Sequence, residues 1–154
     1  MEVFNLFDGD LDPPRPDAPP GFRAMRRKVG ALLGATGIGV SLYELPPGEA
    51  IWPYHYEWGN EEWLLVLEGT ITLRNPSGEQ PLAPGALVCF PEGPDGAHLV
   101  RNDAAVAARV AIISTMRDPA IAEFPDSEKI GVWAGEVSHM LRRSAQLDYW
   151  DGEA

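Results

Sequence analysis

Short apolar or alternating segments follow one another along the middle of the chain, and turn residues separate them. Residues 38–45 end at Pro46-Pro47-Gly48, and residues 62–68 run to Gly69. Further segments of this kind span residues 50–57, 70–74, 86–90, 97–102 and 106–115. Segments of this length that are bounded by Gly, Pro and Asn are typical of strands in a β-sandwich or small barrel. The pattern therefore predicts an all-β fold.

The two ends of the chain depart from this pattern. Residues 12–21 are rich in proline and show no apolar period, which is typical of an extended segment. We therefore expect an extended N-terminal arm over residues 1–22, a barrel over residues 23–117 and a C-terminal tail over residues 118–154 that packs on the barrel. Within the tail, residues 136–150 form the one stretch whose pattern permits a short helix.

The composition agrees with this picture and excludes two classes of partner. The 16 Gly and 15 Pro residues disfavour long helices and favour many turns. Acidic side chains outnumber basic ones by 23 to 12, which gives a net charge of −11. Nucleic acids and anionic membrane surfaces bind clustered Lys and Arg, so we expect neither as a partner.

The terminus and the cysteine content indicate the compartment. Residues 1–12 carry acidic side chains and no basic one, which is the opposite of a signal peptide. The apolar runs are too short to span a bilayer. Cys89 is the only cysteine, so an internal disulfide is impossible. We therefore expect a cytoplasmic protein.

A basic cluster lies before the predicted barrel strands, in the sequence Arg23-Ala-Met-Arg-Arg-Lys28. Such a cluster can bind a phosphate group. Lys and Arg also protect the exposed edge of a sheet from pairing with other chains. The second interpretation, a solvated strand edge, is favoured by the sequence alone.

Two histidines and two carboxylates occupy positions suited to a metal site. His55 and Glu57 are two residues apart in a predicted strand, so their side chains share one face. A turn follows them, and Glu62 on the returning strand can face the same interior. His98 lies in a later strand that barrel closure could bring to the same point. Imidazole and carboxylate groups that converge in this way suit a divalent transition metal. The alternative is a row of exposed polar side chains.

These residues stand in an arrangement that resembles the two motifs of the cupin superfamily. The first motif has a glycine, a His-X-His pair, a glutamate and a second glycine, and it resembles Gly48, His55, Glu57, Glu62 and Gly69. The second has a glycine, Pro-X-Gly, a histidine and an asparagine, and it resembles Gly85, Pro91, Gly93, His98 and Asn102. The resemblance covers roughly residues 38–115. This chain departs from it by short insertions and by a glutamate in place of the second histidine.

The resemblance implies a double-stranded β-helix, or jelly-roll barrel, that holds a metal. Carried over residue by residue, the ligands would be His55, Glu57, Glu62 and His98. The ion would be Fe, Mn, Ni, Co or Zn, because no thiolate narrows the choice. Two alternatives stay open: Glu57 can miss the ion and act beside it, and the site as a whole can have lost its metal. Leu64 and Val66 share the interior face with Glu62 and are expected to form an apolar wall for a small ligand.

The resemblance implies a metal-binding single-domain cupin, and three functions are compatible with the residues. The favoured one is an enzyme that acts on a small polar molecule by dioxygenase, isomerase or decarboxylase chemistry. No separate acid–base pair is identifiable, so whether the protein is an enzyme stays open. The second is a non-catalytic protein that binds or senses a small ligand, and the third is a structural barrel without metal. The Pro-rich arm and the Trp-bearing tail favour a homodimer.

Overall fold

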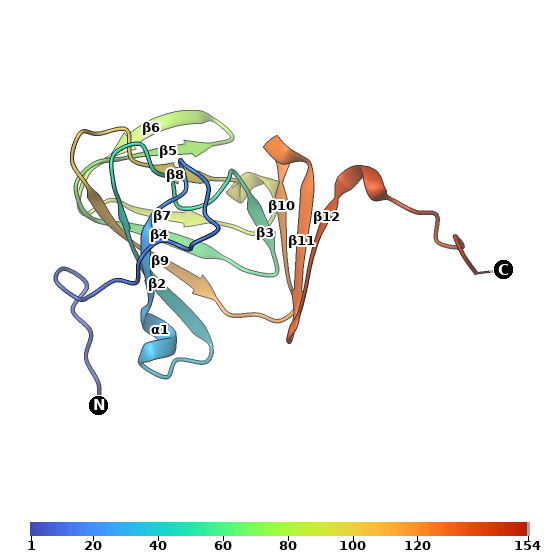
Figure 1. Cartoon of the computed structure of the whole chain (residues 1–154), viewed down its shortest axis with the longest axis horizontal. Coiled ribbons are helices and arrows are strands. Elements are labelled where there is room, and N and C mark those ends of the chain that lie inside the picture. Colours follow the sequence, from blue (N-terminus) through green and yellow to red (C-terminus); the bar gives the residue numbers. More distant parts are fainter. Residues whose placement is uncertain (154) are drawn as a thin grey trace.

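Five antiparallel strands form the larger layer of the barrel in the computed structural model, which describes residues 1–153 (Figure 1). Their spatial order is β1-β2-β9-β4-β7, and every neighbouring pair is antiparallel. The strands are β1 (Met25–Lys28), β2 (Ile38–Leu45), β9 (Ala108–Thr115), β4 (Glu62–Glu68) and β7 (Leu87–Phe90). The basic cluster thus falls on an edge strand, as the sequence favoured.

Two smaller sheets complete the structure. One has the order β6-β5-β8, and the other has the order β12-β11-β10-β3. Their strands are β3 (Tyr56–Trp58), β5 (Ile71–Asn75), β6 (Gly78–Leu82), β8 (Leu99–Arg101), β10 (Ala120–Phe124), β11 (Lys129–Ala134) and β12 (Val137–Arg142). The single bridge Ala50↔Arg101 connects the segment after β2 to β8, and the single bridge His55↔His98 connects two residues that lie just outside the named strands. The all-β jelly-roll fold expected from the sequence is confirmed.

The core lies between the larger sheet and the sheet of β5, β6 and β8. Side chains two residues apart on each strand point into it, because successive residues of a strand face opposite sides. Leu64 and Val66 of β4 face Leu73 of β5 and Val100 of β8 in this way, and all four are buried. The remaining members of the cluster are Tyr43, Leu45, Ile51, Ile71, Phe90, Ala108, Val110 and Ile112.

Helices are few and short. The one α-helix in residues 1–153 is α1 (Val29–Leu32), which connects β1 to the turn before β2. Three 3-10 turns span Pro94–Gly96, Pro125–Ser127 and Arg143–Ala145. No helix in this described part of the chain is long and apolar enough to cross a membrane. The expected cytoplasmic location stays a prediction.

The N-terminal arm is held against β1 and β9. Asp12 pairs with Arg26 through reciprocal backbone hydrogen bonds of 2.9 and 3.1 Å. The guanidinium of Arg109, which is 8% exposed, donates to the carbonyl of Gly9. The arm therefore covers the free edge of β1 at Arg26 and supplies a partner to a buried charge.

The C-terminal segment contains strands where the sequence permitted a helix. Within residues 136–150 the chain forms β12, and the helical part is only the 3-10 turn Arg143–Ala145. Gly135, with φ of 57°, and Glu136 join β11 to β12 in a two-residue turn. Such a turn fixes an antiparallel hairpin, and this pairing overrides the weak helical pattern. The last described residues extend away from the barrel (Figure 1).

Asn102 fastens the turn between β8 and β9. Its side chain is 0% exposed, and its Nδ2 donates to the carbonyls of Leu45 and Val106, both at 2.8 Å. Its Oδ1 accepts from the backbone N–H of Ala104 at 2.9 Å. Three hydrogen bonds, one buried and two partly buried, therefore depend on one buried amide group.

Replacing Asn102 by Ala leaves the buried carbonyl of Leu45 and two partly buried backbone groups without this partner. We expect the free energy of unfolding to fall by about 2–3 kcal/mol. Chemical denaturation of both proteins measures this change. Asn75→Ala is the matched control, because Asn75 accepts from Ser77 N–H in a similar turn at the surface. An equal loss in both variants would contradict the role given to Asn102.

Candidate metal centre

Two histidines from distant segments meet directly across a backbone ladder. His55 lies just before β3, and His98 lies between the turn Pro94–Gly96 and β8. The N–H of each residue donates to the carbonyl of the other, at 3.1 and 2.8 Å. Directly paired residues of antiparallel segments place their side chains on one face, so the two rings lie together with centroids 4.7 Å apart.

Each imidazole is fixed by a backbone carbonyl. Nδ1 of His55 lies 2.9 Å from the carbonyl oxygen of Pro53, and Nδ1 of His98 lies 2.9 Å from that of Gly96. A carbonyl oxygen only accepts, so Nδ1 carries the proton in both rings. Nε2 is left with its lone pair, which is the form of histidine that binds a metal.

Aromatic side chains hold the two rings in place. The ring of Phe90 stacks on His98 with centroids 3.7 Å apart and planes inclined by 7°. Phe124 of β10 stacks on His55 at 5.7 Å and 20°. The C-terminal sheet therefore contributes to the orientation of a histidine from the first motif.

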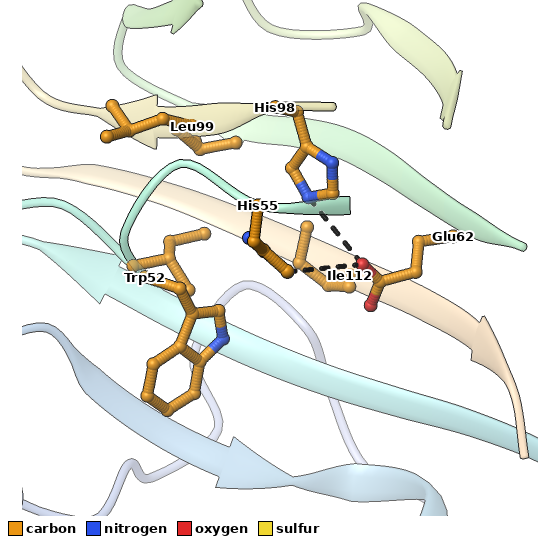
Figure 2. Close-up of a pocket in the computed structure, with 8 residues that line it drawn as sticks. Trp52, His55, Glu62, His98, Leu99 and Ile112 are labelled. Carbon is orange, nitrogen blue, oxygen red and sulfur yellow. Dashed lines mark ion pairs between the residues drawn. The ribbon is translucent and has the colours of Figure 1, made fainter. Parts of the chain in front are cut away.

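Glu62 brings a carboxylate to the same point from the larger sheet (Figure 2). Its Oε2 lies 3.8 Å from Nε2 of His55 and 3.6 Å from Nε2 of His98. Both distances are too long for hydrogen bonds. When N and O ligands each lie about 2.0–2.2 Å from one ion, the distance between two of these ligand atoms is only slightly shorter than the two distances found here. The three groups, whose ligand atoms all lie within 4.8 Å of one another, therefore fit around one ion.

The electrostatics of the site also favour a cation. Burial, with a further contribution from the neighbouring His55, lowers the pKa of His98 to about 3, and burial likewise lowers the pKa of His55. Both imidazoles are thus neutral at pH 7. Burial and the nearby Glu57 carboxylate raise the pKa of Glu62 to about 8. A buried carboxylate in this position gains most from a bound cation, which offsets both its lost hydration and the repulsion.

Glu57 lies beside this group and outside it. The cluster of ligand atoms that converge consists of His55, Glu62 and His98. Glu57 is half-buried on β3, and burial raises its pKa, against the lowering effect of a hydrogen bond with Asn60. Its carboxylate is close enough to act on Glu62 through its charge. The structure therefore brings together three of the four predicted ligands, and the role of Glu57 stays a prediction.

A small cavity of about 10 Å³ adjoins the three ligands. Its apolar walls come from Ile51, Trp52, Leu99, Val100 and Ile112. Leu64 and Val66, which the sequence suggested for this wall, are buried in the core and are not among the residues that line this cavity, so their contact with a ligand stays a prediction. Sequence reasoning missed Trp52 as a site residue. The signal available was its position three residues before His55 in the first motif.

Comparison with known proteins agrees with this architecture. A family model for the cupin domain matches residues 41–114. Among curated proteins, none matches the chain. A proposed sugar phosphate isomerase from Acidithiobacillus ferrooxidans superposes with a TM-score of 0.78 and 25% identity, over 84% of this chain and 82% of the other.

Two further solved structures share the fold at lower identity. One, a sugar phosphate isomerase of the cupin superfamily from Silicibacter pomeroyi, has a TM-score of 0.83 and 21% identity over 97% of this chain and 98% of the other. The second, the polyketide cyclase RemF from Streptomyces resistomycificus, has a TM-score of 0.62 and 20% identity over 76% and 80%. The chain therefore carries a cupin domain over residues 41–114 and folds as a cupin barrel.

Proposed function

We propose that the protein is a metal-dependent enzyme, and more specifically an isomerase that acts on a small hydroxylated molecule. The observation that carries this proposal is the buried convergence of His55, Glu62 and His98 beside an apolar cavity. The likeness to the proposed sugar phosphate isomerase at 25% identity supports the reaction class among the three that the sequence left open.

His55, Glu62 and His98 would hold the ion. When bound, a divalent ion polarises carbonyl and hydroxyl oxygens of a substrate, which is the chemistry that an isomerisation needs. The protein contributes the surroundings. Ile51, Leu99 and Ile112 exclude water from the ligand atoms, and the two fixed Nδ1 protons keep both rings in the ligating form.

The expected ligand set gives a direct test of metal binding. Purified protein is expected to take up about one equivalent of Mn, Fe, Co, Ni or Zn. Free ion at about 100 times Kd adds about 2.7 kcal/mol to the stability of the fold. His55→Ala and His98→Ala are expected to abolish this gain, measured by thermal unfolding with and without the ion.

His139→Ala is the matched control, because His139 is exposed on β12 and far from the converging group in sequence. It is expected to keep both the metal content and the thermal shift. A wild-type protein that takes up no ion from any of the five solutions would contradict the metal site.

The predicted fourth ligand is tested by restoring the histidine of the resembled motif. If Glu57 coordinates the ion, Glu57→His is expected to tighten Zn or Ni binding by about tenfold or more, as changes at ligand positions do. Competition with a chromophoric chelator measures the change. Glu61→His is the control, because Glu61 is exposed. Equal affinity in wild type and Glu57→His would place Glu57 outside the coordination sphere.

The reaction class is tested on the metal-loaded protein. Aldoses, ketoses and their phosphate esters are incubated with it in deuterated water and followed by NMR. Conversion between isomers is expected for at least one of them, and His98→Ala should lower the rate by about 100-fold or more. A compound that binds and is recovered unchanged would favour the alternative, a protein that binds or senses a small ligand.

A further inference from the structure

One face of β1 turns toward the barrel interior. Arg26 pairs with Tyr43 of β2, and Lys28 pairs with Ser41. Tyr43 is a buried member of the core, so the side chain of its direct partner lies on the inner face as well. Ala24, two residues before Arg26, packs against the same core. Strand alternation therefore places Arg26 on the inner face and Arg27 on the outer face, while Lys28, on the same side as Arg26, lies at the end of the strand and is exposed.

The outer and inner arginines differ in how their charge is satisfied. Arg27 forms an ion pair of 3.0 Å with Asp12 and donates to the carbonyl of Asp10. Arg26 is half-buried, and within residues 1–153 no carboxylate lies within ion-pair distance of it. Its guanidinium instead lies over the ring of Trp52, 5.5 Å from the centroid. The guanidinium of Arg26 therefore keeps its donors available for an anion, whereas that of Arg27 already has a carboxylate partner.

Protection of the sheet edge does not account for Arg26. The backbone of Arg26 is already paired with Asp12 of the arm, so the edge is covered at this residue without any help from charge. The arm supplies its carboxylate to Arg27 and leaves Arg26 unpaired.

Polar groups surround the guanidinium of Arg26 on the inner face. Burial raises the pKa of the Tyr43 hydroxyl, while the nearby charge of Arg26 lowers it. The ring of Trp52 meets Tyr43 edge-on, with centroids 6.3 Å apart. Arg26, Tyr43, Trp52 and Ser41 thus form one cluster, with Lys28 two residues along the same face.

Trp52 connects this cluster to the metal centre. It lines the cavity beside His55 and Glu62, and its indole extends from there toward β1, the blue strand in Figure 2. Trp52 therefore contacts both regions, because it lines the cavity and its ring also lies beside the guanidinium of Arg26. In a chain with a net charge of −11, this is a local positive site that an anion would be drawn to.

We propose that Arg26 is the binding residue for a phosphate group on the substrate, beside the Trp52 ring that lines the metal cavity. A guanidinium presents parallel N–H donors that match phosphate oxygens, and the Tyr43 and Ser41 hydroxyls and the Lys28 ammonium add further donors. The proposal rests on the proposed function, because it names the substrate of that site as a phosphorylated molecule.

The test uses inorganic phosphate as the probe and measures its affinity by calorimetry and by phosphorus NMR. Arg26→Met keeps the length of the side chain over Trp52 and removes the charge. It is expected to weaken phosphate binding by about tenfold or more, whereas Arg26→Lys should retain part of the affinity. Arg27→Met removes the same charge from the outer face of the same strand and is expected to bind phosphate within about threefold of wild type.

Phosphate affinity is measured for both the metal-free and the metal-loaded protein. No phosphate binding by wild type in either form, or equal binding by wild type and Arg26→Met, overturns the proposal. So does an equal loss in Arg26→Met and Arg27→Met, which would show a general effect of charge. Thermal unfolding of each variant identifies a purely structural role, in which Arg26→Met loses stability and keeps its phosphate affinity. If no metal is taken up, the proposed function fails, and phosphate binding by the metal-free protein still decides the role of Arg26.

Discussion

The reciprocal backbone hydrogen bonds between His55 and His98 are the constraint on which the site depends. They join two segments that lie 43 positions apart in the sequence, and they close the barrel at the point where its chemistry is located. Because the pairing sets both rings on one face, the orientation of the two lone pairs follows from main-chain geometry. The carbonyls of Pro53 and Gly96 and the rings of Phe90 and Phe124 then remove the remaining freedom of each imidazole.

The general architecture and the three residues of the candidate metal centre could be predicted from the sequence because both depend on local patterns. Turn residues mark the strand ends, and the period of two places His55 on an inward face. Leu64 and Val66 show where this reasoning ends. They do share a face with Glu62, yet position along the strand decides which side chains of this face lie against the cavity, and of the three only Glu62 does. Where the cavity lies depends on how the sheets pack, and no single segment encodes it.

Long-range pairing explains the other differences. The basic cluster could be assigned to a strand edge from its composition, whereas the division into inner and outer charges follows from the register of β1 on β2. In the same way, β12 forms because Gly135 allows a tight turn and β11 offers an edge, although its own residues show no strong strand pattern. The homodimer expected from the arm and tail stays a prediction.

The size of the cavity has a consequence for the choice of ion. A space of about 10 Å³ beside the ligands holds about one water molecule. Three or four protein ligands and one such water give a coordination number of about four or five. Mg²⁺ and Ca²⁺ require about six or more oxygen ligands, which are protein oxygens or water molecules. An ion held by two imidazoles, one carboxylate and a single water or substrate oxygen has fewer oxygen ligands than Mg²⁺ or Ca²⁺ require, so the site selects against those ions in addition to the preference of imidazole for transition metals.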